Sequence, residues 1–234
     1  MQKKDLIMPQ LSADLAEETG IHIGDGSMNL YRSSGKNHWG YVYSAHAEDD
    51  KDYAKYVKSL MKKLYNLDPQ IRVKRTCMML SYTRKNLVLF KRRKGLPFGK
   101  KNNITIPKWI FKKKKYLMAC IRGIVDTDGC VRFRKPYKGK LNNYPEIRLS
   151  NKSKQLIFQV AEILRNLGFK PSLYEEKISK TKPNHIWVLN LNGVNQLEKY
   201  LQIIRFSNPK HSNKINFWRT YGYYDKESYK KWRH

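Results

Sequence analysis

The chain has 234 residues, and 48 lysines and arginines against 19 aspartates and glutamates give it a formal net charge of +29. This length suits one large domain or two small ones, and a hydrophobic content of 40% argues against a disordered chain. No apolar run approaches the roughly 18 residues of a membrane span, and three cysteines without a CxxC pair exclude a disulfide framework and a zinc ribbon, so we expect an intracellular protein of a cytoplasm, nucleoid or organelle.

In chain order, hydrophobic periodicity predicts a helix that ends at Asp25, strands over 28–33 and 39–44, a helix over 52–66, strands over 71–76 and 78–84, and a helix over 86–93. After a tether, the second half predicts a helix that ends at Asp128, strands over 131–135 and 146–150, a helix over 153–167, strands over 172–178 and 185–191, and a helix over 194–204.

The shared element order predicts an α+β fold of two pseudo-symmetric αββαββα repeats. We expect the first repeat at residues 1–106, a linker at 107–115, and the second repeat at 116–234 with a basic, aromatic C-terminal tail. Helices on one face of each antiparallel sheet would leave the other face free.

The positive charge is spread along the whole sequence and is densest at residues 91–94, 112–115 and 229–233. A surplus of this size repels itself unless a polyanion binds, which favours nucleic-acid binding. The alternatives are a solvated lysine-rich surface and a basic membrane-surface helix, which would need a basic face opposite an apolar face, and no segment has one clearly.

Each predicted opening helix closes on Asp-Gly, at Asp25 and 103 positions later at Asp128. A single Asp-Gly is usually only a helix-ending turn, but a carboxylate there faces the negative end of the helix dipole, and here it occurs twice. Small residues at matching positions would let the two helices pack with their backbones nearly touching: Gly20, Gly24, Gly123 and Thr127. Asp25 and Asp128 would then lie together and repel each other unless a divalent cation, Mg²⁺ for hard oxygen ligands, neutralised them.

Residues 20–26 and 123–129 resemble the two motifs of the LAGLIDADG homing endonucleases, and the resemblance covers essentially the whole chain. Glu18-Thr19 and Ile121-Arg122 depart from the opening of the motif, but the closing acids are kept. The resemblance implies a monomer in which two four-stranded sheets form a saddle over the DNA major groove. The motif helices would hold metals over the minor groove, and both strands would be cut to leave short 3′ overhangs.

The resemblance also implies roles for individual residues. It implies five catalytic residues, Asp25, Asp128, Lys101, Lys210 and Asn151, and metal ligands at Asp25, Asp128, Gly24 and Thr127. In a chain this rich in lysine, Lys101 and Lys210 could instead be surface charge. The first-repeat counterpart of Asn151 stays open between His46 and Glu48, and His22 and Asp126 are expected to be structural.

Strand alternation predicts which residues face DNA. It turns Arg72, Lys74, Arg132, Arg134, Glu146 and Arg148 outward, and Ile71, Val73, Val131, Phe133, Ile147 and Leu149 toward the core. Outward arginines can read guanine and a glutamate can accept from cytosine, while contact with phosphate alone is the alternative for each.

The resemblance implies a site-specific endonuclease that cuts a long asymmetric duplex and, by its family role, initiates the mobility of the intron that encodes it. An intein is disfavoured because the sequence starts at Met1 and finishes at His234 without splicing residues. An intron RNA maturase or non-cleaving nucleic-acid-binding protein of the same fold remains the alternative, with host intron RNA as partner, although it would not need both acids. A ribosomal-type RNA-binding protein would not explain the duplication.

Overall fold

The computed structural model describes residues 6–33, 35–101, 103–177 and 185–233. The first repeat contains α1 (Ala13–Asp25), β1 (Gly26–Ser33), β2 (Lys36–His46), α2 (Lys51–Tyr65), β3 (Gln70–Lys74), β4 (Cys77–Thr83) and α3 (Lys85–Arg93). The second contains η1 (Lys108–Lys112), α4 (Lys114–Asp128), β5 (Gly129–Arg134), β6 (Tyr144–Asn151), α5 (Lys154–Asn166), β7 (Ser172–Glu176), β8 (Ile186–Asn192), α6 (Val194–Ile203), α7 (Pro209–Tyr221) and α8 (Lys226–Arg233).

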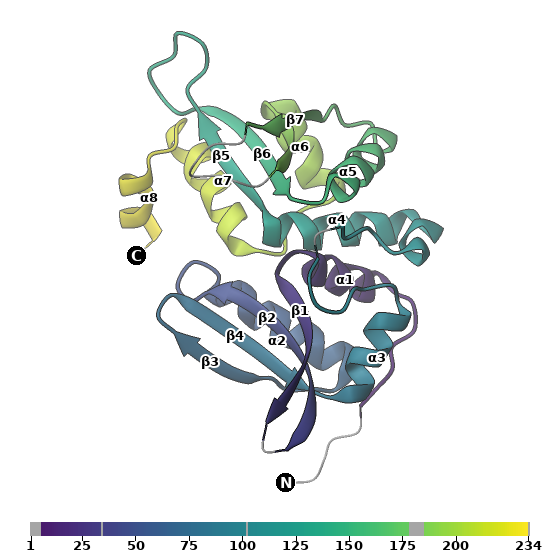
Figure 1. The fold of residues 1–234 in the computed structure, drawn as a ribbon. Helices are drawn as coiled ribbons and strands as arrows, with labels where there is room; N and C mark the ends of the chain where they lie inside the picture. The colour runs from purple at the N-terminus through teal and green to yellow at the C-terminus, as the bar shows by residue number, and fades with distance from the viewer. Residues whose placement is uncertain (1–5, 34, 102, 178–184, 234) are drawn as a thin grey trace.

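Each repeat forms one four-stranded antiparallel sheet, with strand orders β1-β2-β4-β3 and β5-β6-β8-β7 (Figure 1). The predicted αββαββα order and the α+β class are therefore confirmed, with element ends shifted by a few residues. The predicted strand over 172–178 ends at Glu176, and residue 178 lies outside the described residues. No described helix is long and apolar enough for a membrane span.

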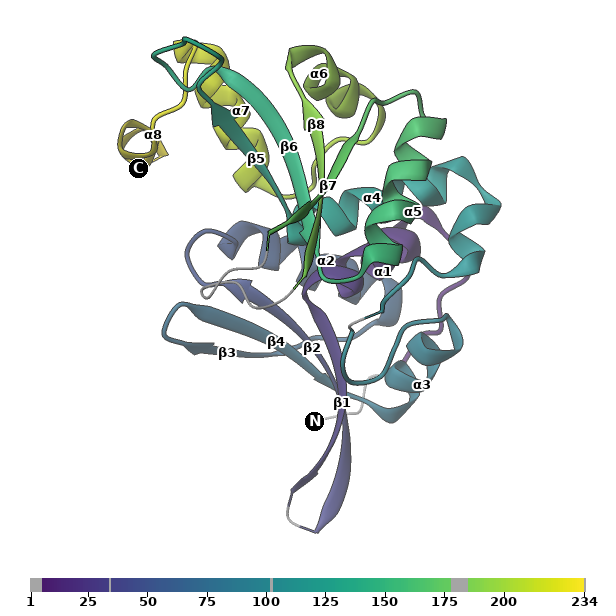
Figure 2. The same ribbon diagram turned by 45° about the horizontal axis from the view of Figure 1, so that its top comes forward.

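The seam between the repeats is made by α1 and α4, which lie side by side across the middle of the molecule (Figures 1 and 2). A Cβ on Gly20 would lie 2.2 Å from the Cys120 carbonyl oxygen, and one on Gly123 would lie 2.3 Å from that of Glu17. Any larger residue would clash with backbone at both places, so the expected close approach of the two helices is confirmed. This approach carries the two Asp-Gly ends to the same place.

Two acids in the middle of α1, Glu17 and Glu18, are buried, and each is matched by a partner. Glu17 accepts hydrogen bonds from Arg122 of α4 (Nη2, 2.5 Å), from the Tyr56 hydroxyl (2.7 Å) and from the Ser207 hydroxyl (2.6 Å), so it joins the two repeats. Such pairing is required because an unpaired buried charge is strongly destabilising.

Glu18 pairs instead within the first repeat. It accepts hydrogen bonds from the buried Lys91 ammonium and from the hydroxyls of Tyr65 (3.0 Å) and Tyr41 (3.3 Å). Because Glu17 and Glu18 both have partners, this helix departs from the apolar opening of the motif without burying an unpaired charge.

The C-terminal segment forms two helices where the sequence predicts only a tail. Asn208 caps α7 by accepting from the Lys210 amide (3.0 Å), Pro209 occupies the first turn, and Gly222 ends the helix at φ 73°. Tyr229 of α8 is 6% exposed, because its ring packs against Phe217 and other aromatic rings. This aromatic packing places α8 at the left edge of the molecule in Figure 1.

Candidate active site and nucleic-acid surface

The C-terminal ends of α1 and α4 bring Asp25 and Asp128 into one partly buried acidic centre. The pKa of Asp25 is raised to about 7, first by burial and then by the negative charges of Asp128 and Asp50, against the opposing charges of Lys101 and Lys210. Burial also raises the pKa of Asp128, against the hydrogen bond from Asn151 and the charge of Lys101. The structure thus brings together the two acids that the sequence predicts to meet.

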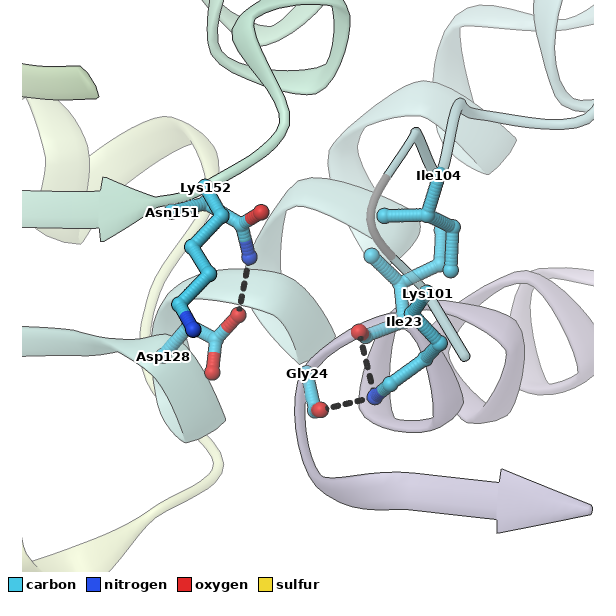
Figure 3. A pocket seen from close by; sticks show the side chains of 7 residues that line it. All are labelled: Ile23, Gly24, Lys101, Ile104, Asp128, Asn151 and Lys152. Atoms are coloured by element: carbon cyan, nitrogen blue, oxygen red, sulfur yellow. Dashed lines mark hydrogen bonds between the residues drawn. The ribbon is translucent and has the colours of Figure 1, made fainter. Parts of the chain in front are cut away.

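A pocket of about 200 Å³ opens beside Asp128 and is lined by residues of both repeats (Figure 3). Asn151, the last residue of β6, donates from Nδ2 to Asp128 Oδ2 at 2.8 Å. Its own Oδ1 accepts from the amide of Ser153 at 2.8 Å, which fixes the orientation of the amide group. Ser153 in turn caps α5 and donates to the carbonyl of Ile104 (2.7 Å), in the loop that carries Lys101.

Lys101 reaches into this pocket and donates to the last carbonyls of α1. Its Nζ lies 2.9 Å from the oxygen of Ile23 and 3.3 Å from that of His22, and it also hydrogen-bonds the oxygen of Gly24. The His22 carbonyl also accepts from the Gly26 amide, and a cation at this end is favourable because the last carbonyls of a helix carry its negative dipole end. We call Asp128, Asn151, Lys101 and the Gly24 carbonyl the Asp128 site.

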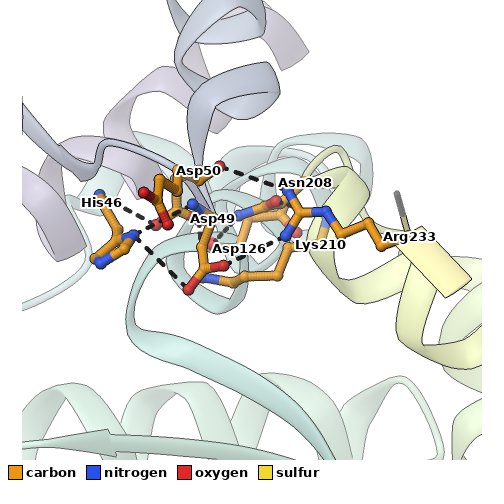
Figure 4. A network of polar contacts seen from close by, with 8 residues as sticks. His46, Asp49, Asp50, Asp126, Asn208, Lys210 and Arg233 are labelled. Carbon is orange, nitrogen blue, oxygen red and sulfur yellow. Dashed lines mark hydrogen bonds and ion pairs between the residues drawn. The ribbon is translucent and has the colours of Figure 1, made fainter. Parts of the chain in front are cut away.

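On the other side of the acidic centre, Lys210 pairs with Asp50 rather than with helix carbonyls (Figure 4). Its Nζ lies 2.8 Å from Asp50 Oδ1, which also accepts from Asn208 Nδ2 at 3.1 Å. Asn208 Nδ2 lies 3.0 Å from the carbonyl oxygen of Asp126, so an amide replaces the lysine at the end of α4. We call Asp25, Asp50, Lys210 and Asn208 the Asp25 site.

Asp50 is the site residue that sequence reasoning misses. Of the two residues left open as counterparts of Asn151, His46 is exposed at the end of β2 and Glu48 is exposed in the following loop. The Asp50 side chain is only 14% exposed. Burial opposes its ionisation, but the hydrogen bond and charge of Lys210 lower its pKa overall. The available signal was its place directly before the helix that starts at Lys51, where an acid is a favoured cap.

The oxygen atoms at the seam suit a hard divalent cation whose remaining ligands are water or phosphate, rather than a metal ion bound by protein side chains alone. Among the described residues, no group of three or more His, Cys, Asp or Glu side chains is placed to hold a metal ion. The Thr127 hydroxyl donates to the Gly123 carbonyl at 2.8 Å, which turns it back along α4 and leaves the backbone oxygen of Thr127 as a candidate ligand. One carboxylate from each helix, together with backbone carbonyls, leaves positions that water and phosphate oxygens can fill, which is the donor set Mg²⁺ prefers.

His22 and Asp126, expected to be structural, are both buried beside the seam. His22 stacks on Tyr41 with ring centroids 5.3 Å apart, and burial lowers its pKa so that it is neutral. Asp126 accepts from the Ser207 amide at 2.8 Å, and burial raises its pKa well above the usual range. Both residues therefore lie in the packing behind the acidic centre.

The open face of the second sheet carries the predicted outward residues, but its arginines are already paired with acids. Register places Arg132 opposite Glu146, and this glutamate is 1% exposed because Arg132 and Arg134 (2.8 Å) both bind it. Arg148 pairs with Glu176 in the same way. Glu146 therefore orients both of these arginines.

The open face of the first sheet has its predicted charges, Arg72 and Lys74, on the edge strand β3. The expectation that Ile71 and Val73 are buried is wrong: they are 51% and 59% exposed. Their register, opposite Leu80 and Met78, does place them on the helix side of the sheet. Strand β3 lies at the edge of the sheet, and all five of its residues are exposed.

The comparisons with known proteins agree with this geometry. A family model described as a LAGLIDADG-like domain matches residues 115–205. No curated protein sequence matches the chain.

Several solved structures share the fold. Mesophilic variants of the homing endonuclease I-DmoI match with a TM-score of 0.58 at 20% identity, over 82% of this chain and 95% of theirs. The LAGLIDADG homing endonuclease I-GzeII in complex with its DNA target matches with a TM-score of 0.57 at 10% identity, over 95% and 96%. The N-terminal LAGLIDADG domain of DUF199/WhiA matches with a TM-score of 0.51 at 11% identity, over 84% and 83%.

The family model falls on the second repeat, and the solved structures cover both. Residues 115–205 form a LAGLIDADG-like domain, and the whole chain has the two-repeat fold of the single-chain LAGLIDADG homing endonucleases.

Proposed function

We propose that this protein is a site-specific DNA endonuclease that makes a staggered, divalent-cation-dependent double-strand break in a long asymmetric target. The observation that carries the proposal is the acidic centre at the seam. Each repeat contributes one carboxylate, and the pKa of Asp25 is raised to about 7 because burial and the neighbouring acids make its negative charge unfavourable, a penalty that a bound cation would relieve. Two such acids, one from each repeat, suit the cutting of two antiparallel strands.

Similar structures support the choice of substrate and cation. I-DmoI variants crystallised with their target DNA in the presence of Mn or Mg have TM-scores of 0.58 to this chain. We propose Mg²⁺ as the cation, held by Asp25 and Asp128 with the backbone oxygens of Gly24 and Thr127. Bound there, the ion would polarise the scissile phosphate and lower the pKa of an attacking water.

The other residues of the two sites orient these groups. Asn151 holds Asp128 in place through Nδ2 and can hydrogen-bond the attacking water once a phosphate displaces part of that contact. Lys101 places a positive charge beside both acids, where it balances charge that develops on the scissile phosphate. Lys210 and Asp50 form an ion pair that fills the corresponding place beside Asp25.

Target recognition is assigned to the two open sheet faces. The outward residues of the two sheets differ: the first has Arg72 and Lys74 at its edge, whereas the second has Arg132, Arg134 and Arg148 around buried or half-buried acids. Two unlike faces, each covering about one helical turn, imply an asymmetric target of roughly 20 base pairs. We further propose that the enzyme acts as a monomer, that it is encoded by an intron whose mobility it starts, and that it works inside the cell.

The proposal is tested by cleavage of a plasmid that carries a target selected by the protein from a randomised duplex library. Asp25→Asn and Asp128→Asn should each abolish linearisation in Mg²⁺ and keep DNA binding, because loss of a negative charge beside phosphates does not weaken affinity. Asp14→Asn, the same change at the far end of α1, is the matched control and should cut like the wild type. Linearisation by either site variant at the wild-type rate, or by the wild type in EDTA, would contradict the proposal.

A further inference from the structure

A cavity of about 990 Å³ lies between the C-terminal helix α8, helix α7 and the loop that precedes α2. Six of its ten lining residues are lysine or arginine, and only two are acids, Glu48 and Asp49. Six cations around one open cavity repel one another, so this part of the surface is arranged for an anionic ligand.

One of these cations, Lys214, has no ion-pair or hydrogen-bond partner among the described residues. Its side chain is half-buried, and its ammonium forms no ion pair or hydrogen bond with any residue that the structure describes. The nitrogen lies 6.0 Å from the centre of the Tyr224 ring, and burial lowers its pKa. An uncompensated ammonium in the wall of a cavity is a costly feature that a bound phosphate would offset.

The cavity is attached to the Asp25 site through two neighbouring acids. Lys210 lines the cavity and also binds Asp50 at 2.8 Å, while Arg233 of α8 reaches across to Asp49 at 3.3 Å (Figure 4). The loop of the first repeat that carries Asp50 is therefore held by the last helix of the second repeat. A chain of phosphates that leaves the Asp25 site would pass along this wall.

The position of α8 is fixed by packing, whereas its lysines are exposed. Tyr229 is buried, with its ring centre 5.3 Å from that of Tyr224, while Lys226, Lys230 and Lys231 are exposed. No element equivalent to α7 and α8 follows α3 among the described residues, because the chain leads from α3 to η1. Only the second repeat therefore carries this basic extension.

We propose that the α8 cavity binds the phosphate backbone of the target DNA beyond the Asp25 site, and so extends the protein–DNA contact on one flank only. This inference rests on the proposed function, since it names a further contact of the same substrate. Six cations spread over the two helices α7 and α8 suit a series of phosphates rather than a single small anion, and lysines act there as point charges without base readout.

The test compares two triple variants with equal loss of charge. Lys226→Gln/Lys230→Gln/Lys231→Gln removes three cations of the cavity. Lys112→Gln/Lys114→Gln/Lys115→Gln removes three exposed cations at the start of α4, about 20 Å along that helix from Asp128. Affinity for the library-selected target in EDTA should fall at least tenfold for the α8 variant, and its log–log salt slope should flatten by about 2–3. The α4 variant should keep the wild-type slope.

A second arm uses the same target with either flank shortened by about one helical turn, or 10 base pairs. Shortening the flank beyond the Asp25 site should weaken binding by the wild type but should not change the affinity of the α8 variant. Shortening the opposite flank should change the affinity of both proteins by the same factor. Equal losses for the α8 and α4 variants, or equal effects of both flanks in both proteins, would overturn the inference. Either of those results would leave the proposed function intact, because the wild type would still bind and cleave its target. If the wild type selects no target from the library, both the proposed function and the α8 contact are refuted.

Discussion

The Asp128 site and the Asp25 site place the same residue types differently. At the Asp128 site, a neutral amide holds the acid and Lys101 binds the carbonyl end of the opposite motif helix. At the Asp25 site, the amide of Asn208 binds the helix end, and the lysine is taken by a second acid, Asp50. The pseudo-symmetry of the fold therefore does not extend to its chemistry, and the two DNA strands would meet different sites.

The difference predicts that the two strands can be separated by single substitutions. Lys101→Met should slow one nicking step by about 10²–10³-fold, because a charge beside the scissile phosphate is lost. Lys210→Met should slow the step at the Asp25 site, and the nicked plasmid that accumulates should carry its break in the opposite strand. Strand-specific sequencing of the nicked product measures this, with exposed Lys113→Met as control. If both variants spare the same strand, the two lysines do not serve separate sites.

The acidic centre should also lower the free energy of unfolding, and Asp25 should contribute more to this loss than Asp128. When folding raises the pKa of a carboxyl group, ionisation of that group destabilises the folded protein. The penalty is complete above about pH 7 and disappears as the pH falls from about 7 toward 4. Asp25→Asn should therefore raise the free energy of unfolding by about 2–3 kcal/mol at pH 8. Urea titrations at pH 8 and pH 5 check this, and an equal gain at both pH values would contradict it.

The two sheets should differ in how their arginines read DNA. Arg134 is held by Glu146, so Arg134→Ala should cost about 1–2 kcal/mol at one base position and relax specificity there. Arg72, which lies on the exposed edge strand, should weaken all sequences alike when changed to alanine, as expected for a phosphate contact. Competition binding against every single-base variant of the target distinguishes these outcomes. A uniform loss for Arg134→Ala would mean that Glu146 orients it toward phosphate.

The smallest expected effect concerns the pH dependence of one strand. The charge of Asp50 helps to raise the pKa of Asp25, so Asp50→Asn should shift the acid limit of cleavage at the Asp25 site to lower pH, by about one unit. The reciprocal change, Asn151→Asp, should shift the limit at the Asp128 site upward. Nicking rates of each strand from pH 5.5 to 8.5 measure both shifts. An unchanged profile in both variants would show that these acids do not control the titration.

Most of the fold could be predicted because hydrophobic periodicity and the repeated Asp-Gly ends were both strong signals. The contact between the motif helices followed from Gly20 and Gly123, since only small residues allow such an approach. The helices α7 and α8 were missed because their high charge concealed spaced aromatic residues such as Phe217 and Tyr229, which pack mainly on each other. Their burial depends on contacts within the C-terminal segment that periodicity does not report.

The candidate site was predicted less completely. The two acids and Asn151 follow from position in the repeat, but Asp50 does not, because its role depends on which lysine reaches it across the seam. The pairing of Arg132 and Arg134 with Glu146 likewise depends on strand register, which the sequence leaves free to slip by one residue. Contacts between repeats and between strands are therefore the part that the sequence does not specify directly.

The buried contact of Glu17 with Arg122 bears on how freely the halves of such proteins can be exchanged. Aligned on Gly20 and Gly123, Glu17 corresponds to Cys120 and Arg122 to Thr19. A pair of first repeats would leave Glu17 opposite a threonine, and a pair of second repeats would leave Arg122 opposite a cysteine, with a buried charge unmatched in each case. Each half therefore accepts the other and disfavours a copy of itself. A chimera that takes either half from elsewhere has to import the matching residue along with the motif helix.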